Sequence, residues 1–327
     1  INASENNKNM SYLAKVYDYL IRKNYSRDCV IFGVGGGITC DMTGFIASTF
    51  LRGVDFVLVP TTLLSQVDAS IGGKTGVNHK GFKNMIGTFN QPVQVIIDTK
   101  FLKSLSKLEI QCGLMEVIKH GLISDEGFFV WLEKNLKEIL SLKPQFLERA
   151  IKRSIEIKAA VVSKDEKENG LRAILNFGHT FGHALETIGN NKLYTHGEAV
   201  ALGMLAATKL SESTSDLDSK AFDRVHSTIK KTGIRVKLKK KIFPKKLIKL
   251  MQSDKKKNNN QLKFILLEKI GKAKIKSISN EVTIENAGIS IVRSCLYCIN
   301  VMDSDIFEVH KYRSATEKLL AQITSFE

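Results

Sequence analysis

The spacing of apolar and polar residues separates a region of short apolar runs from a region of long helical repeats. Met10–Arg22 has apolar residues at helical spacing, and Cys29–Phe32 is a short apolar run that ends at the glycine-rich Gly33–Gly37. A second helical pattern covers Thr39–Phe50. This order predicts helix, strand, glycine turn and helix, a context in which backbone N–H groups hold a pyrophosphate.

Two further buried strands are predicted over Val54–Val59 and Val93–Ile97, and the long polar segment between them is predicted to be a functional loop. The glycine cluster lacks the G-x-G-x-x-G spacing, and Gly72–Thr75 lacks the first glycine of a P-loop. The order of strands and helices predicts a Rossmann-like α/β domain over residues 1–104, and the glycine cluster alone is weak evidence for nucleotide binding.

From Ser104 onward the pattern becomes helical and stays so. The predicted helices cover residues 105–122, 128–142 and 144–163. A charged segment, residues 164–170, separates them from a histidine-rich stretch. The fold class is thus α/β, with an all-helical second domain over residues 105–290 that would bind metal and substrate. Residues 291–327 form a C-terminal extension to which the sequence assigns no role.

Three of the seven histidines, His179, His183 and His196, fall within one short stretch. His179 and His183 are four apart and share one face of a helix, an arrangement that a divalent metal or an anionic substrate can use. The plain alternative is two surface histidines and one that caps a helix. Glu116 stands among apolar residues and shares a helix face with Lys119. A glutamate and two histidines form a catalytic zinc pattern, so Glu116 is the candidate for the missing ligand.

Composition excludes several classes of protein. The chain has 327 residues, 43% of them apolar, and no apolar run approaches the length of a membrane span. Its five cysteines are few and odd in number, which favours a reducing compartment and a cytoplasmic location. Cys295 and Cys298 have the spacing of half a zinc or redox site, but the sequence has no second pair.

The net charge of +16 comes from one segment, residues 229–276, where 18 Lys and Arg face only Asp254 and Glu268. The lysines alternate with apolar residues, which is typical of the solvated face of an amphipathic helix. Only Phe243 and Phe264 offer aromatic rings for base stacking, which argues against nucleic-acid binding. A solvated face, with one or two lysines turned toward an acidic substrate, is the preferred interpretation.

Several motifs occur in one order along the chain and together resemble the 3-dehydroquinate synthases, part of the sugar-phosphate cyclase family related to iron-type alcohol and glycerol dehydrogenases. The motifs are Gly35–Gly37, Arg52–Gly53, Pro60–Asp68, Gly72–Lys74, Lys83–Gly87, Glu116–Lys119, Asn176–Thr180, His196–Val200 and Asp254–Lys256. The resemblance runs from about Glu5 to Gly288.

The resemblance implies a set of binding residues. Zinc, with Co²⁺ as an alternative ion, would be held by Glu116, His179 and His196. NAD would lie against Gly36, Gly37, Asp41, Thr61, Thr62, Lys83, Phe101, Leu102, Lys103 and Ser104. A sugar phosphate would be bound by Asp68, Lys74, Asn84, Lys158, Arg172 and Lys256. Arg52 would reach into the site of the neighbouring subunit of a homodimer.

The resemblance also implies the chemistry. The family converts 3-deoxy-D-arabino-heptulosonate 7-phosphate into 3-dehydroquinate and phosphate, a shikimate-pathway step toward aromatic amino acids, through transient oxidation by NAD. The residues implied in catalysis are His183, Glu168, Lys119 and Asn176, with Glu168 and His183 as the pair that handles protons. A basic pocket for a phosphate and a carboxylate is what such a substrate requires.

The chain also departs from the family pattern. The family has some tens of residues before the point where this chain starts, so the Rossmann-like domain is expected to be truncated at its start. Ser4–Lys8 retains only part of a Gly-Glu-x-x-Lys loop, and Cys40 replaces a usual glycine. The alternatives are another sugar-phosphate cyclase, a metal-dependent polyol dehydrogenase, or an inactive truncated homologue.

Overall fold

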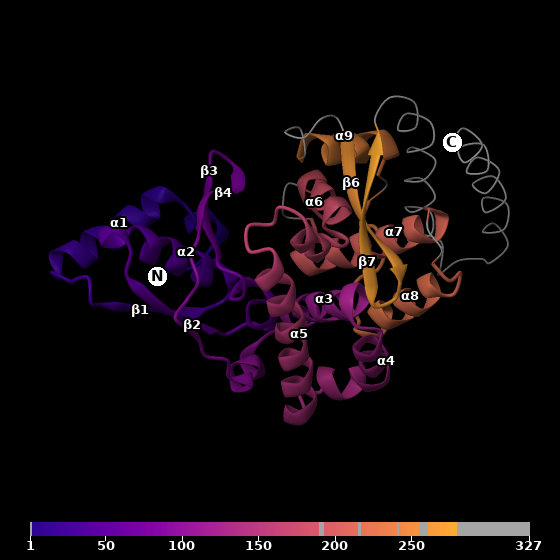
Figure 1. The fold of residues 1–327 in the computed structure, drawn as a ribbon, viewed down its shortest axis with the longest axis horizontal. Coiled ribbons are helices and arrows are strands. Elements are labelled where there is room, and N and C mark those ends of the chain that lie inside the picture. The colour runs from indigo at the N-terminus through magenta and orange to yellow at the C-terminus, as the bar shows by residue number, and fades with distance from the viewer. Residues whose placement is uncertain (1, 190–192, 215–216, 241, 255–260, 280–327) are drawn as a thin grey trace. The chain divides into compact units, whose positions relative to one another are not determined.

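The structure, a computed structural model, describes residues 2–189, 193–214, 217–240, 242–254 and 261–279 (Figure 1). The chain forms two compact units. Unit 1 comprises the residues up to Val117 together with Glu138–Arg172, and unit 2 comprises Ile118–Lys137 together with the residues from Ala173 onward. The division passes through helix α3 (Lys107–Ser124), which belongs to both units. The predicted domain limits at residues 104 and 290 stay predictions.

Unit 1 is built on a parallel sheet with the strand order β1-β2-β5. The strands are β1 (Val30–Gly35), β2 (Asp55–Pro60) and the short β5 (Gln94–Val95). Helix α1 (Met10–Arg22) precedes β1, and α2 (Gly37–Thr49) connects β1 to β2. A helix that links two neighbouring parallel strands is the βαβ unit, so the predicted α/β character of the first part is confirmed.

The core of unit 1 surrounds α2, because both sides of this helix are apolar. Met42 and Ile46 pack with Leu13 of α1, while Ala47 packs with Phe56 of β2. All five side chains are buried. This packing anchors the glycine turn between β1 and α2 on two sides.

The segment predicted to be a functional loop between β2 and β5 is structured instead. It contains one turn of π-helix, Ser65–Ala69, and an antiparallel hairpin of β3 (Lys74–His79) and β4 (Phe82–Phe89). The hairpin turns at Lys80 and Gly81, both at positive φ (47° and 84°), as a tight two-residue turn requires. The strands contain glycine and polar residues on both faces, which hid the period of two from the sequence analysis.

Unit 2 is mainly helical. Its helices are the second half of α3, most of α4 (Glu126–Leu140), α6 (His179–Ile188), α7 (His196–Thr214), α8 (Ala221–Lys231) and α9 (Pro244–Asp254). Helix α5 (Pro144–Lys164) lies in unit 1. None of the helices among the described residues is both long and apolar enough to cross a membrane. The predicted helical character of the second part is confirmed.

Unit 2 also contains a β-hairpin that the expectation of an all-helical domain did not include. It consists of β6 (Gln261–Lys269) and β7 (Lys272–Ser279), which pair in antiparallel fashion. The buried run Phe264–Leu267 lies in β6, and the N–H of Leu267 donates to Ser211 Oγ of α7 at 2.9 Å. The many lysines in this segment gave it the pattern of a solvated helix face. A strand that is buried on both sides also lacks the alternation of apolar and polar residues by which a strand is recognised.

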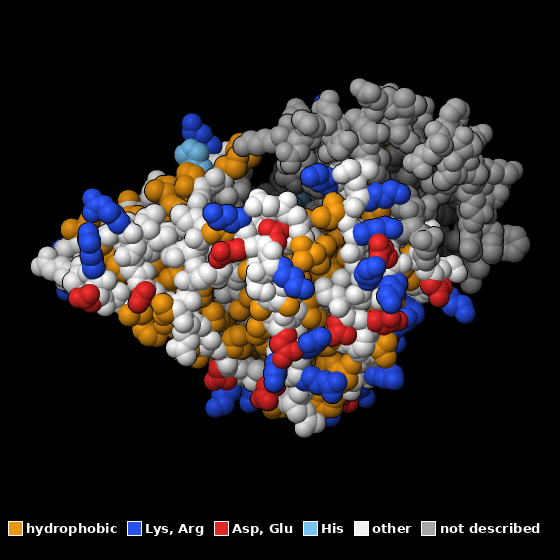
Figure 2. Space-filling view, viewed as in Figure 1, with side chains coloured by type: hydrophobic (Ala, Val, Ile, Leu, Met, Phe, Trp, Pro, Cys, Tyr) orange, Lys and Arg blue, Asp and Glu red, His pale blue; other side chains and the backbone are white. Residues whose placement is uncertain are grey.

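Some of the described lysines in the basic segment form ion pairs, and others lie over the β6–β7 hairpin. Lys239 Nζ lies 2.9 Å from Glu198 Oε2, and Lys272 Nζ lies 2.6 Å from Glu268 Oε2. Figure 2 shows Lys and Arg side chains over the β6–β7 hairpin with acidic side chains among them. These placed lysines fit the interpretation of a solvated, charged face.

Candidate active site and metal centre

Two of the predicted metal ligands begin helices. His179 is the first residue of α6, and the preceding Gly178 has φ 81°. A Cβ at Gly178 would lie 2.7 Å from the backbone N of Met204 on α7, so only glycine allows α6 to start this close to α7. His183 lies one turn further along α6, with its ring centroid 5.4 Å from that of His179.

His196 is the first residue of α7 and is held by a capping box. The N–H of Thr195 donates to Glu198 Oε2 at 2.9 Å, and the N–H of Glu198 donates to Thr195 Oγ1 at 3.3 Å. The ring centroids of His179 and His196 lie 5.5 Å apart. The close packing of α6 on α7 thus places these two imidazoles together, as the sequence predicted.

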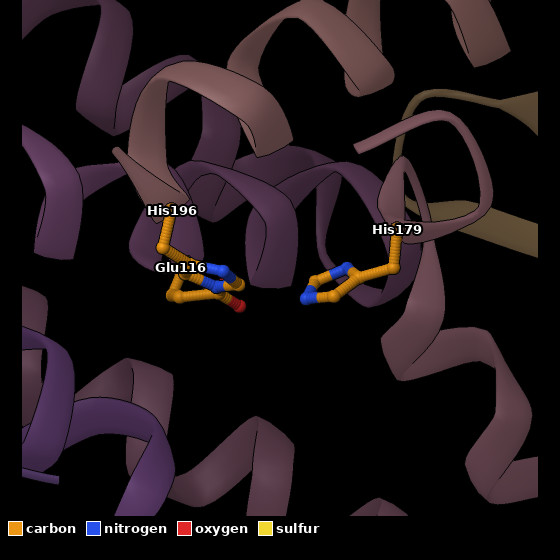
Figure 3. Close-up of side chains that lie close together, drawn as sticks. All are labelled: Glu116, His179 and His196. Carbon is orange, nitrogen blue, oxygen red and sulfur yellow. The ribbon is translucent and has the colours of Figure 1, made fainter. Parts of the chain in front are cut away.

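The third predicted ligand, Glu116, is completely buried on α3, the helix that continues into the unit of the histidines. Glu116, His179 and His196 each offer one ligand atom, and these atoms lie within 4.8 Å of one another. In Figure 3 the ring of His179 faces Glu116 and His196. Donors around one zinc ion lie at most about 4 Å apart, since each bond is about 2.0–2.2 Å long. Side-chain shifts of less than 1 Å therefore suffice, and the donor set fits zinc.

The contacts of the two histidines favour Nε2 as their ligand atom. His179 Nδ1 lies 3.3 Å from the backbone O of Phe177, and His196 Nδ1 lies 3.7 Å from Oε1 of the buried Glu186. An acceptor near Nδ1 favours the tautomer that carries its proton there, which leaves the Nε2 lone pair for a metal. Glu186 was not identified from the sequence, although it lies seven residues after His179 on the same helix face.

A second donor group consists of Asp68, Glu116 and His120, whose ligand atoms also lie within 4.8 Å of one another. His120 is completely buried and follows Glu116 by one helical turn. The sequence analysis did not select it, and its only sequence signal is the i+4 spacing. Lys119, predicted to act in catalysis, is also buried on α3.

Unit 1 contains a polar cavity of about 590 Å³. Five of the predicted substrate-binding residues line it, namely Asp68, Lys74, Asn84, Lys158 and Arg172. The π-helical turn provides Asp68, and the β3–β4 hairpin provides Lys74 and Asn84. Residues that span more than a hundred positions in the sequence thus share one cavity.

The charged side chains of the cavity are held by opposite charges or by backbone groups. Lys158 Nζ lies 2.5 Å from Asp68 Oδ1, and Lys74 pairs with Glu168. Arg172 Nη2 donates to the backbone O of Gly72 at 2.8 Å. These contacts hold the cations in place, and an anion that enters the cavity would compete with Asp68 and Glu168 for the two ammonium groups.

Lys8 contacts two predicted site residues, although the sequence predicted no role for it. Its side chain is buried, and Nζ pairs with Asp41 and lies 2.5 Å from Asn84 Oδ1. It thereby joins a residue predicted to bind NAD to one predicted to bind substrate. Burial raises the pKa of Asp41, and the Lys8 ammonium opposes that shift. The sequence feature that pointed to Lys8 is its place at the end of Ser4–Lys8, the partial Gly-Glu-x-x-Lys loop. Such a short segment does not predict a buried ion pair.

Four predicted NAD contacts gather where β1 and β2 end. Gly36 caps α2 and Gly37 is its first residue, while Thr61 N–H donates to the backbone O of Gly35 at 2.8 Å. A Cβ on Gly36 would lie 3.2 Å from Thr62 Cγ2. The carboxyl ends of parallel strands and a helix N-terminus are where such sheets bind dinucleotides.

The remaining predicted residues have different positions. Asp41 lines the cavity, and Lys83 is exposed on β4. Phe101, Leu102, Lys103 and Ser104 lie on a 3₁₀ helix, Thr99–Ser104, and Asn176 ends another, Leu171–Asn176. Arg52 is exposed, has φ 70°, and is not among the described residues that line the cavity. Lys256 lies outside the described residues.

The chain matches two family models and is similar to curated relatives. The model described as 3-dehydroquinate synthase N-terminal matches residues 1–112, and the one described as 3-dehydroquinate synthase C-terminal matches residues 113–257. The 3-dehydroquinate synthase of Idiomarina loihiensis is 47% identical over 270 residues, which are 83% of this chain and 75% of that protein.

Solved structures extend the comparison. The 2-epi-5-epi-valiolone synthase of Streptomyces hygroscopicus, with NAD⁺ and Zn²⁺ bound, has a TM-score of 0.81 at 26% identity and covers 91% of this chain and 81% of its own. A 2-deoxy-scyllo-inosose synthase with carbaglucose-6-phosphate, NAD⁺ and Co²⁺ has a TM-score of 0.77 at 28% identity, over 84% and 78% of the two chains. With both family models covering residues 1–257, the chain belongs to the 3-dehydroquinate synthase family.

Proposed function

We propose that this chain converts 3-deoxy-D-arabino-heptulosonate 7-phosphate into 3-dehydroquinate and phosphate, with NAD and zinc as cofactors. The observation that carries the proposal is the donor set of Glu116, His179 and His196, with ligand atoms within 4.8 Å of one another. A carboxylate and two imidazoles are ligand types found at catalytic zinc sites, and they leave a fourth position for a substrate oxygen.

Zinc, when bound, polarises a substrate oxygen, and NAD accepts and returns a hydride. The chain's own residues hold and orient these groups. Glu116 supplies the buried negative charge, and the Glu186 carboxylate, 3.7 Å from His196 Nδ1, favours a proton on that nitrogen. The glycine turn at Gly36 and Gly37 gives a pyrophosphate access to the start of α2.

The cavity in unit 1 has the chemistry for an anionic substrate. Lys74, Lys158 and Arg172 line it, and cations with fixed positions bind phosphate and carboxylate through charge-assisted hydrogen bonds. Glu168 pairs with Lys74, so an incoming anion competes with this carboxylate for the ammonium. Displacement of Glu168 would leave it as a proton acceptor, the role expected of it together with His183.

The proposal includes a homodimer in the cytoplasm. Arg52 is exposed on unit 1 and does not line the cavity of its own chain among the described residues, which supports a role in the site of a second copy. Among the described cysteines, Cys29, Cys40 and Cys112 form no disulfide, which supports the proposal of a reducing compartment.

A polyol dehydrogenase of related fold is the main alternative activity. Lys74, Lys158 and Arg172 line the cavity, and a neutral polyol has no anionic group for them to bind. These three cations therefore argue against a polyol dehydrogenase. The test supplies the zinc-loaded protein and NAD with either glycerol or the heptulosonate phosphate, then identifies products by NMR. We expect 3-dehydroquinate from the sugar phosphate and no reaction with glycerol. Sustained NADH formation from glycerol, without 3-dehydroquinate, would reverse the assignment.

A further inference from the structure

Two residues that serve the cavity, Glu168 and Arg172, lie on the segment that follows α5. Glu168 pairs with Lys74, and Arg172 lines the cavity itself. Glu168 has φ 59°, a left-handed conformation that is unfavourable for residues other than glycine. A segment with such a residue keeps its conformation only if other contacts hold it there.

Asp165, the residue that ends α5, provides these contacts. Its Oδ1 accepts from the N–H of Asn169 at 2.8 Å. Its Oδ2 accepts from the N–H of Gly170 at 2.8 Å and from that of Arg172 at 2.9 Å. The backbone O of Asp165 accepts from the N–H of Glu168 at 3.4 Å. One residue thus organises the backbone of the whole segment 166–172.

The organised segment contacts the residues that flank the β3–β4 hairpin, Gly72 before β3 and Gln91 after β4. Arg172 Nη1 donates to the backbone O of Glu166, and its Nη2 donates to the backbone O of Gly72 at 2.8 Å. Gln91 Nε2 donates to Glu166 Oε1 at 2.8 Å. These contacts hold Arg172 and Glu168 beside the open end of the hairpin, where Lys74 begins β3.

The Asp165 carboxylate is ionised at neutral pH. The N–H groups of Arg172 and Asn169 hold the pKa of Asp165 below its usual value. Asp165 itself is not among the described residues that line the cavity. Its influence on a bound anion must pass through the residues that it holds.

We propose that Asp165 is a positioning residue, whose carboxylate holds the segment 166–172 so that Glu168 and Arg172 face Lys74 and the anion-binding cavity. This inference rests on the proposed function for the identity of the substrate. The ordering of the segment and the binding of an anion do not depend on the proposed function. Both can be measured without substrate.

The experiment compares Asp165→Ala, Asp165→Asn and the matched control Lys167→Ala, which removes an exposed charge from the same segment. Amide hydrogen exchange over residues 166–172 should become faster in the Ala variant and stay unchanged in the control. Calorimetry with inorganic phosphate should show weaker binding to the Ala variant. Unchanged zinc content and melting temperature would establish that the rest of the protein is intact.

The conservative variant should recover part of the effect. An asparagine oxygen in the place of Oδ2 can accept from Gly170 and Arg172, but its amide NH₂ then faces the N–H of Asn169. We expect kcat/KM to fall about 10- to 100-fold for Asp165→Ala, as for other misplacements of about 1 Å, and to an intermediate value for Asp165→Asn.

A double variant separates positioning from a general loss of structure. In a Glu168→Gln background, Asp165→Ala should lower kcat little further, because the group that it positions is already lost, while KM should still rise through Arg172. Additive losses in kcat, or unchanged exchange and phosphate binding in Asp165→Ala, would overturn the inference. A wild-type protein without activity would instead overturn the proposed function, and exchange and phosphate binding would still decide the role of Asp165.

Discussion

We propose that single residues in this chain separate metal binding from substrate chemistry. His179 and His196 share a donor set with Glu116, whereas His183 lies edge-on to His179 and is not a member of that set. Three protein donors are the usual minimum at a catalytic zinc site, so the loss of any one of Glu116, His179 and His196 should release the ion. A histidine outside the set is available to move protons.

Alanine variants test this separation. Glu116→Ala, His179→Ala and His196→Ala should each lose zinc, measured by elemental analysis. His183→Ala should keep its zinc and lose turnover by about 10²- to 10⁴-fold, the range for a positioned acid–base group. Circular dichroism serves as the control for folding. Loss of zinc from His183→Ala, or full zinc and activity in Glu116→Ala, would contradict the ligand assignment.

Glu186 gives a second prediction at this scale. Its carboxylate lies 3.7 Å from His196 Nδ1, so it orients the ring and favours the tautomer that binds metal through Nε2. Glu186→Gln should weaken zinc binding by about 10- to 100-fold in competition with a chelator, the usual effect of such outer contacts. Glu148→Gln, which changes an exposed glutamate of α5, is the control. Equal zinc affinities would show that Glu186 does not support His196.

The sequence predicted the site residues mainly where they belong to a recognisable motif. Glu116, His179 and His196 stand in recognisable motifs, and so do three of the five residues found in the cavity, Asp68, Lys74 and Asn84. Lys8, Glu186 and His120 act through contacts that depend on the packing of helices and hairpins, and no spacing in the sequence encodes those distances. Lys8 illustrates this, because its partner Asn84 is 76 positions away.

Among the elements, the starts of α6 and α7 determine where two of the proposed metal ligands, His179 and His196, lie. The capping box of Thr195 and Glu198 fixes the first turn of α7 and so the backbone of His196. Burial alone would raise the pKa of Glu198, but the N–H of Thr195 and the Lys239 ammonium outweigh it and hold that pKa below its usual value. Glu198 is therefore ionised at neutral pH and stabilises the folded state.

This capping box predicts a pH dependence of stability. Glu198→Gln should lower the melting temperature at pH 7 by about 2–4 °C, the effect of losing roughly 1 kcal/mol. Because the folded-state pKa is depressed, the contribution is complete above the unfolded value of about 4.3 and is lost as the pH falls through the folded-state pKa. The difference between wild type and variant should thus shrink on acidification. A difference that grows toward low pH would mean that Glu198 is stabilising as a neutral acid.

The sequence predicted helices better than hairpins. The predicted helix Met10–Arg22 matches α1 at both ends, because its apolar stripe is regular and Asn9 caps it by accepting from Tyr12 N–H at 2.9 Å. The β3–β4 hairpin was predicted to be a loop and β6–β7 to be helical. Their strands mix glycine, lysine and apolar residues without a clear period of two, and their pairing is settled by contacts with α2 and α7.

At the scale of the whole molecule, we predict a homodimer in which Arg52 of each subunit completes the active site of the other. Arg52→Ala and His183→Ala chains should each be inactive alone, since each removes one part of the same composite site. Mixing them under conditions of subunit exchange should restore up to about a quarter of the activity, because hybrid dimers keep one site intact. Size-exclusion chromatography with light scattering checks the dimers. Folded, exchanging dimers with no recovered activity would place Arg52 outside the partner's site.

The central claim is that the chain is a phosphate-eliminating cyclase that returns the hydride it takes. The most direct test is release of inorganic phosphate from 3-deoxy-D-arabino-heptulosonate 7-phosphate by the zinc-loaded protein, with NAD present or removed. The account predicts many turnovers of phosphate release that depend on NAD, with no accumulation of NADH, because the cofactor is restored in each cycle. Absence of phosphate release, or NADH that accumulates in proportion to substrate consumed, would contradict it.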